Sequence, residues 1–427
     1  MTATQPVAAT TSQQSIFHQI VVVGGGSAGV TVAAQLLKKM RSLDILIIEP
    51  SAQHYYQPGW TLVGGGCIPF EKTVQSEQKQ IPQEATWLQD RVVQFDPDHN
   101  SLHTDNGTQV SYDYLVVCPG IQIDWDQIKG LKDALGQGGV CSNYAIQGAT
   151  YTWETIQNFK GGNAIFTYPA TPIKCAGAPQ KVMYLAEETF AQNGVRQNTT
   201  ISYCTATGKI FGVDAFVPAL MEVVQRKSIH LKTSHNLQEI QSAEKIAIFE
   251  VTKDAETETI SIPYDMIHVT PPMSAPDVIK QSSLSVDGPG GWVDVNQYTT
   301  QHNRYPNIFS LGDASSLPTS KTAAAIRREA PVLVQNLMAH MNQAALSGKY
   351  QGYSCCPLIT GYGKTILAEF DYEQNLDPSF PLDPTQERAS MWFLKRHVLP
   401  WIYWNRMLKG GEHEGNIIRR LLPSKRS

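Results

Sequence analysis

The chain has 427 residues, of which 42% are hydrophobic and 17% are charged, a balance typical of a globular protein with two or three domains. A net charge of −4 gives no support for nucleic-acid binding, and seven cysteines in so long a chain do not indicate a disulfide framework. No apolar run approaches the roughly 18 residues of a spanning helix. Residues 1–15 resemble neither a secretory signal nor a transit peptide, so we expect a disordered tail at 1–17 and a cytoplasmic protein.

The first predicted unit is a strand, a glycine turn, a helix, a second strand and an acid. An apolar run at 20–23 leads into a G-x-G-x-x-G turn, and a helical pattern at 30–40 and an apolar run at 45–48 follow. Such glycines allow a tight turn, the approach of a pyrophosphate and close packing of helix on strand, while the helix N-terminus offers N–H groups to phosphates. The residues expected to contact a dinucleotide are Gly24, Gly26, Ser27, Ala28, Gly29 and Glu49. A plain strand-to-helix connector is the alternative.

An aromatic loop and a run of short strands come next. Residues 50–66 are rich in aromatics and glycine, and a loop at this place commonly folds back over the cofactor, although a packed surface loop is also possible. Residues 86–117 alternate like antiparallel strands, with a hairpin turn at Asn106 and Gly107. We expect Cys118, after the last strand, to be a small core residue near the cofactor.

A second α/β pattern occupies the middle of the chain. It predicts strands at 163–168 and 201–205 with a helix at 179–190 between them. Reductases that use NADH carry a second glycine turn after the first of these strands. Here the segment 168–177 has two prolines and a cysteine in place of those glycines, so we do not expect a nicotinamide donor.

The dinucleotide domain then resumes with a strand beginning at residue 307. This strand ends in Gly312 and Asp313, and a carboxylate at this place in FAD enzymes suits the ribityl chain. Lys321 opens the following helix, where it would stabilise negative charge on a reduced flavin. A solvated lysine in the first helical turn is the alternative.

The C-terminal part differs in kind because aromatic and basic residues alternate from 392 to 426. Residues 391–427 carry eight Lys or Arg and two Glu, a net charge of +6, which leaves −10 for the rest of the chain. An amphipathic, basic, Trp- and Tyr-rich segment is typical of helices that lie on a membrane. We therefore expect a peripheral membrane protein, with a dimer interface as the alternative.

Two of the seven cysteines stand out by their surroundings. Cys175 lies between a strand and a helix start, where the helix dipole with Lys174 and Lys181 would favour a thiolate. Cys356 lies in a Cys-Cys-Pro-Leu-Ile-Thr-Gly-Tyr segment. By spacing alone, a buried inert cysteine remains the usual reading of either residue.

At these cysteines the sequence resembles sulfide:quinone oxidoreductases of the type that includes the mitochondrial enzymes. The similarity covers about residues 18 to 410, and its two cysteine motifs are highly specific. The motifs that carry it are Lys-Cys-Ala-Gly-Ala-Pro-Gln-Lys at 174–181, Cys-Pro-Leu-Ile-Thr-Gly-Tyr at 356–362, Tyr-Gln-Pro at 56–58, Val-Thr-Pro-Pro-Met-Ser at 269–274 and Leu-Pro-Thr-Ser-Lys-Thr-Ala-Ala-Ala at 317–325.

The resemblance implies a redox cysteine pair beside a noncovalent FAD. Sulfide attacks the oxidised pair, one cysteine keeps a persulfide, and two electrons pass by way of the flavin to a membrane quinone. Cys356 would carry the persulfide and Cys175 would face the flavin, whereas Cys355 would be a bystander. Gln57 joins the residues expected at the cofactor. Glu329 stands where we expect a glutamine, and its charge would disfavour an anionic reduced flavin.

We therefore predict a sulfide:quinone oxidoreductase on the cytoplasmic side of a membrane, with sulfide, sulfite or a thiol as the sulfur acceptor and no metal site. The rivals are a membrane-associated NADH:quinone oxidoreductase, an exported flavin subunit of a sulfide-oxidising cytochrome complex, and a non-catalytic FAD redox sensor. The predicted fold is α/β with two Rossmann-like domains of the disulfide reductase kind. Its expected parts are the FAD domain at 18–125 and 298–350, a second Rossmann-like domain at 126–297, and a C-terminal region with interfacial helices at 351–427.

Overall fold

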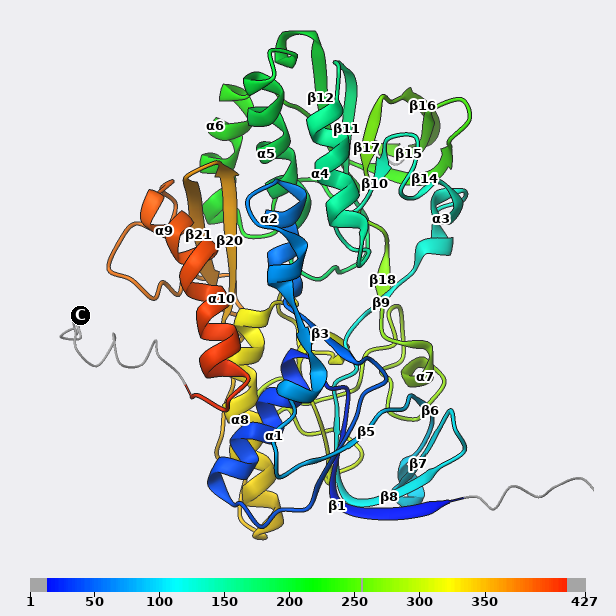
Figure 1. Ribbon diagram of the computed structural model, residues 1–427, viewed down its shortest axis with the longest axis vertical. Helices are drawn as coiled ribbons and strands as arrows, with labels where there is room; N and C mark the ends of the chain where they lie inside the picture. The colour runs from blue at the N-terminus through cyan, green and yellow to red at the C-terminus, as the bar shows by residue number, and fades with distance from the viewer. Residues whose placement is uncertain (1–13, 255, 413–427) are drawn as a thin grey trace, which may run out of the picture.

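The computed structural model describes residues 14–254 and 256–412. Two α/β halves lie one above the other in Figure 1, and the helical C-terminal segment runs alongside the junction between them. Residues 1–13 of the expected tail lie outside the described residues. Residues 15–17 are not a tail, because the first strand begins at Ser15 and these three residues pair with residues 109–111.

The first half is built on a seven-stranded sheet of order β5-β2-β1-β8-β7-β6, with β19 also paired to β8. Its strands are β1 (Ser15–Val23), β2 (Ile45–Ile48), β5 (Thr86–Leu88), β6 (Val92–Asp96), β7 (Ser101–Thr104), β8 (Gln109–Val117) and β19 (Ile308–Ser310). The predicted antiparallel run is confirmed for β6, β7 and β8. It is wrong for β5, which pairs in parallel with β2, because the fully buried β2 needs a partner for its outer backbone groups.

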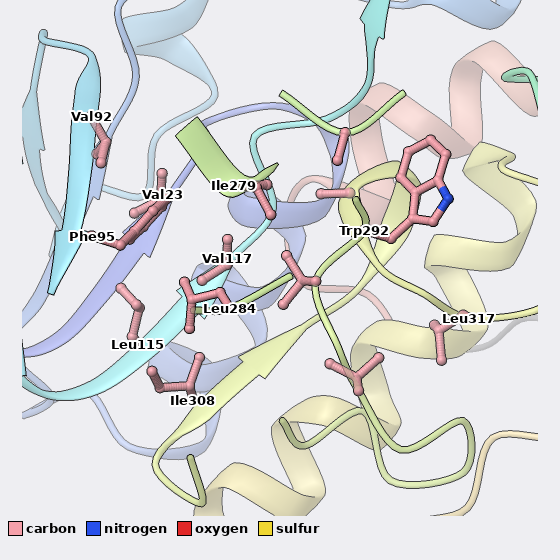
Figure 2. Close-up of a cluster of buried hydrophobic side chains, with 14 of the residues drawn as sticks. Val23, Val92, Phe95, Leu115, Val117, Ile279, Leu284, Trp292, Ile308 and Leu317 are labelled. Carbon is pink, nitrogen blue, oxygen red and sulfur yellow. The ribbon is translucent and has the colours of Figure 1, made fainter. Parts of the chain in front are cut away.

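Both faces of this sheet are packed, because successive side chains of a strand point to opposite faces. Ile20 and Val22 of β1 pack against the helices α1 (Ser27–Lys39) and α8 (Ala323–Met341). Val21 and Val23 pack on the other face with side chains from the segment 279–317, among them Ile279, Leu284 and Trp292 (Figure 2). Ile279, Leu284 and Trp292 thus belong to the core of the first half, although the predicted boundary at 297 assigns them to the second domain.

The second half contains a parallel sheet of order β10-β17-β11-β12-β13 and an antiparallel sheet of order β14-β15-β16. The strands are β10 (Val140–Cys141), β11 (Gly162–Tyr168), β12 (Thr199–Thr205), β13 (His230–Lys232), β14 (His235–Gln241), β15 (Ile246–Lys253), β16 (Glu256–Pro263) and β17 (Met266–His268). The helices are α3 (Leu131–Ala134), α4 (Gly148–Asn158), α5 (Ala178–Gln192) and α6 (Val217–Arg226). The predicted strands at 163–168 and 201–205 and the helix between them are confirmed.

Short elements connect the two halves. The chain crosses between them at β9 (Gln122–Ile123) and β18 (Met273–Ser274), which pair with each other (Figure 1). The remaining short elements are β3 (Gln53–Tyr55), β4 (Val74–Ser76), α2 (Trp60–Gly64) and α7 (Asp277–Lys280).

The C-terminal region starts with the hairpin of β20 (Ser354–Gly361) and β21 (Lys364–Phe370), which packs on α5. A continuous helical run at 389–407, called here the C-terminal helix, follows. It consists of α9 (Ala389–Phe393), α10 (Leu399–Ile402) and π-helical turns at Leu394–Val398 and Tyr403–Met407. The predicted interfacial segment at 417–422 lies outside the described residues. Within the described ranges, no helix has both the length and the apolar character needed to cross a membrane.

Candidate active site

A cavity of about 760 Å³ is lined by both halves and by the C-terminal helix. Its walls include the glycine turn, the aromatic loop that follows β2 and the start of the segment leading to α8. They also include the segment that carries Cys175. The loop predicted to fold over a cofactor therefore lies at this cavity.

The glycine turn between β1 and α1 has one open position and two crowded ones. Gly24 has φ +104°, and a Cβ at Gly29 would lie 1.9 Å from the Gly24 carbonyl oxygen, so both shape the turn itself. A Cβ at Gly26 would meet no atom of the described chain within 4 Å. Ser27 and Ala28, in the first turn of α1, line the cavity next to this open position.

Glu49 lies beside the turn at the cavity wall. Its carboxylate accepts hydrogen bonds from the backbone N–H groups of Gly25 (2.9 Å) and Ser51 (2.8 Å). Burial raises the pKa of Glu49, although the two N–H groups oppose this shift. Cys118 is 4% exposed and its thiol lies 3.8 Å from the Gly24 carbonyl oxygen, which confirms the predicted core cysteine.

Asp313 and Lys321 form a second charged part of the wall. Asp313 follows Gly312, which has φ +69°, and burial raises the pKa of the Asp313 carboxyl. Lys321 is 8% exposed, so it is not a solvated lysine. Its Nζ donates to the Ser315 carbonyl (3.0 Å) and lies 3.9 Å from the Trp292 ring centroid. Burial lowers the pKa of Lys321 to about 8. The residue lies just outside α8, whose N-cap is the next residue.

Glu329 lies behind Gly312, to whose N–H its carboxylate is hydrogen-bonded at 2.7 Å. The side chain is 2% exposed, and burial raises its pKa to about 7. This carboxyl contacts the backbone at Gly312 and interacts electrostatically with Asp313 and Lys321, which line the cavity. Its predicted effect on a reduced flavin stays a prediction.

Cys175 and Cys356 meet although 181 residues separate them, with their Sγ atoms 3.7 Å apart. Cys175 is half-buried, has φ +56° and lies three residues before α5. Cys356 comes from β20 and is 1% exposed. Lys181, on the first turns of α5, places its Nζ 3.1 Å from the Cys175 sulfur.

The two sulfurs differ in their electrostatics. The pKa of Cys175 is held well below its usual range, first because the Cys356 thiol donates a hydrogen bond to it and then because of Lys181 and Lys395. The same shared hydrogen bond, with burial, raises the pKa of Cys356. The thiolate of the pair therefore belongs on Cys175.

The lysines that stabilise the Cys175 thiolate are not the same two that the sequence predicted. Lys174 was expected beside Cys175, but its Nζ donates to Gln57 Oε1 at 2.5 Å and so ties the cysteine segment to the aromatic loop. Lys395 of the C-terminal helix contributes to the Cys175 environment instead, and its Nζ donates to the Pro58 carbonyl at 2.8 Å. Burial lowers the pKa of Lys395 to about 8. Sequence periodicity could not find this lysine, because the π-helical turn at Leu394–Val398 changes the helical register.

Cys355 and Cys356 point to opposite sides of β20. Cys356 packs in the core of the second half, whereas Cys355 packs in the core of the first half. Burial raises the pKa of the Cys355 thiol, so it has no thiolate character at neutral pH. Of the other cysteines, only Cys67 is half-buried rather than buried among the described residues, and burial raises its pKa to about 12.

The C-terminal helix has one side in the cavity and one side in solvent. Leu394, Leu399 and Ile402 line the cavity. Phe393 and Trp401, on the same helix, are 59% and 55% exposed. One side of the helix therefore faces an apolar part of the cavity, and the helix exposes two large aromatic rings to solvent.

Comparison with known proteins gives a consistent result. Residues 18–147 match the family described as "Pyridine nucleotide-disulphide oxidoreductase". The chain is 44% identical over 382 residues to the Mus musculus protein named "Sulfide:quinone oxidoreductase, mitochondrial", which covers 90% of this chain and 84% of the relative. It is 45% identical over 384 residues, with the same coverage, to the Dictyostelium discoideum protein of that name. The solved structure of the sulfide:quinone oxidoreductase from Aquifex aeolicus shares the fold, with a TM-score of 0.79, 18% identity and 92% of each chain covered.

Replacing Lys181 with Met should raise the pKa of Cys175, because it removes the ammonium group 3.1 Å from the sulfur. Less thiolate at pH 7 should slow alkylation of Cys175 by iodoacetamide by about tenfold or more. Mass spectrometry of the labelled peptides measures the rate separately for each cysteine. Lys174→Met is the matched control and should change the rate much less; equal effects of the two variants would refute the assignment of Lys181.

Proposed function

This chain belongs to the sulfide:quinone oxidoreductases, and we propose that it oxidises sulfide through Cys175, Cys356 and FAD. The observation that supports these roles is the 3.7 Å approach of the two sulfurs, with the Lys181 ammonium beside Cys175. The fold family implies a flavin, and the residues of the cavity wall fit FAD. Oxidation of sulfide with quinone as the acceptor follows from the family.

The glycine turn fits the dinucleotide part of FAD. The open space at Gly26 leaves room for a pyrophosphate, and the first N–H groups of α1, at Ser27 and Ala28, would bind its oxygens. Glu49 would accept a hydrogen bond from a ribose hydroxyl. Gly24 and Gly29 would hold the shape of the turn.

The flavin end of FAD fits the other charged part of the wall. Gly312, which has a positive φ and does not itself line the cavity, would shape the turn that presents Asp313. Asp313 would bind the ribityl chain, and Lys321 would stabilise negative charge on the ring. Gln57, which is tied to Lys174, would close the site from the aromatic loop. When bound, FAD supplies the two-electron carrier between the cysteine pair and quinone.

The cysteine pair would act in a fixed order. A direct bridge has an S–S bond of about 2.05 Å, so the 3.7 Å separation requires only a small movement of the two sulfurs. Sulfide attacks Cys356 Sγ, the S–S bond breaks, and Cys356 keeps the added sulfur as a persulfide. Cys175 leaves as a thiolate, which Lys181 stabilises. A small nucleophile such as sulfide, sulfite or a thiol would then accept the outer sulfur of the persulfide.

We expect sulfide to bleach the flavin absorbance of the anaerobic protein, whereas NADH should leave it unchanged, since the turn after β11 carries Pro169 and Pro172 in place of glycines. Cys175→Ser and Cys356→Ser should each abolish reduction by sulfide with FAD still bound. Cys67→Ser and Cys204→Ser are matched controls that should keep it. Sulfide-dependent reduction in either serine variant of the pair would contradict the assigned roles.

Gly26→Val should give a folded but colourless protein. The added Cβ would meet no atom of the described chain within 4 Å, and the side chain would instead occupy the space proposed for the pyrophosphate. FAD content is measured by absorbance after gel filtration, and folding by circular dichroism. Gly208→Val, also at an open position, is the control and should retain FAD. If the Gly26→Val protein is yellow and so still holds FAD, the glycine turn is not part of the cofactor site.

The C-terminal helix is proposed to lie on the membrane surface and to admit quinone. Phe393 and Trp401 would enter the lipid interface, while the apolar residues on the other side of the helix would receive the quinone ring. Quinone would then pass from lipid to the cavity without crossing water. The cytoplasmic side of the membrane stays a prediction, and protease treatment of sealed vesicles tests it.

The double variant Phe393→Ser, Trp401→Ser should lower binding to anionic liposomes by roughly tenfold or more, because two exposed aromatic anchors are lost. These substitutions are cleaner than deleting residues 391–427, which would also remove the buried Lys395. Flotation measures binding, and turnover with a long-chain quinone should fall while reduction by sulfide is kept. Unchanged flotation, with loss of dimer in sedimentation, would support the dimer interface instead.

A further inference from the structure

The last turn of the C-terminal helix reaches the glycine turn directly. Tyr403 is 2% exposed, and its hydroxyl lies 2.7 Å from Ser27 Oγ and 2.7 Å from His54 Nε2. Ser27 begins α1 at the cavity, whereas Tyr403 lies 376 residues later in the sequence. A buried hydroxyl thus joins the element proposed to contact the membrane to the element proposed to bind phosphates.

A buried carboxylate completes this connection. His54 Nδ1 lies 2.9 Å from Glu77 Oε2, and both side chains are 2% exposed or less. The other oxygen, Glu77 Oε1, has no hydrogen-bond partner among the described residues and lies 2.9 Å from where a Cβ of Gly25 would be. Glu77 lines the cavity beside Glu49. This unpaired buried oxygen packs against the glycine turn itself, so the carboxyl group connects His54 to the backbone at Gly25.

Packing holds the end of the C-terminal helix against the same region. The Tyr403 ring lies 4.7 Å from the Tyr56 ring, and Trp404 packs edge-on against His54 at 5.6 Å between centroids. Beyond the helix, Lys409 Nζ donates to the Lys79 carbonyl at 2.8 Å. The C-terminal helix therefore closes the dinucleotide end of the cavity as well as its quinone end.

We propose that Tyr403 is a positioning residue for the cofactor: with His54 and Glu77 it holds Ser27 and the glycine turn in place, so that FAD binding and docking of the C-terminal helix stabilise one another. The inference rests on the proposed FAD site. If docking the helix tightens FAD binding, bound FAD must hold the helix in place by the same free energy, because coupling between two equilibria is reciprocal.

Tyr403→Phe tests the proposal because it removes only the hydroxyl and keeps the ring. FAD is removed from the full-length protein, and rebinding is titrated by quenching of flavin fluorescence. We expect the dissociation constant to rise about tenfold, the effect of losing one or two buried hydrogen bonds. The matched control is Tyr112→Phe, since Tyr112 is 3% exposed and its hydroxyl has no partner in the described part of the chain. It should leave the dissociation constant unchanged.

The reciprocal effect separates coupling from a general loss of stability. In the wild-type protein, FAD should protect the segment 395–412 from limited proteolysis, and Tyr403→Phe should remove most of this protection. A purely structural role would speed cleavage equally with and without FAD. Unchanged FAD affinity, or an FAD-independent change in cleavage, would overturn the proposal. If the wild-type protein does not bind FAD, the cofactor assignment itself fails instead.

Discussion

A half-buried thiolate needs a positive charge close to it, and at Cys175 three parts of the chain meet to provide this environment. Lys181 reaches Cys175 from α5, and Lys395 reaches the same region from the C-terminal helix. Neither ammonium is well solvated, because both lysines are at least nine-tenths buried. Each cation stabilises the anion, and the anion offsets part of the cost of burying the cations. The second half, the hairpin and the C-terminal helix therefore have to be assembled together before Cys175 has this electrostatic environment.

The same arrangement fits the proposed chemistry, which needs no nicotinamide. The segment that follows the carboxyl end of β11 reaches the cavity at Lys174 and Cys175, and the carboxyl end of a parallel strand is the usual place for a ligand. Here the segment after this strand carries a cysteine rather than a glycine turn, and the hairpin β20–β21 covers α5 to bring the second sulfur. In the proposed function, the place of a second dinucleotide is thus taken by a redox pair that belongs to the protein.

Local patterns in the sequence were enough to predict the elements that form within a short stretch of the chain. The turn from Gly24 to Gly29 follows from the stereochemistry of glycine, and β11, α5 and β12 follow from periodicity. Long-range features did not follow. One is the parallel pairing of β5 with β2. Another is the burial of Lys395 and Tyr403, because the π-helical turns that carry them depart from the period of a regular α-helix. The meeting of the two cysteines came from the family resemblance, because no local signal joins residues 181 positions apart.

Because side chains alternate along β20, this strand has to pair with β21 in one register. Cys355 and Cys356 are neighbours that point into different cores, so a slip of one residue in pairing with β21 would exchange the two thiols. The slipped hairpin would place Cys355 instead of Cys356 beside Cys175. What prevents this is an irregularity in the pairing between Ile359 and Gly361, near the turn and away from the cavity. The number of residues at the tip of a hairpin therefore decides which of two neighbouring thiols lies beside Cys175.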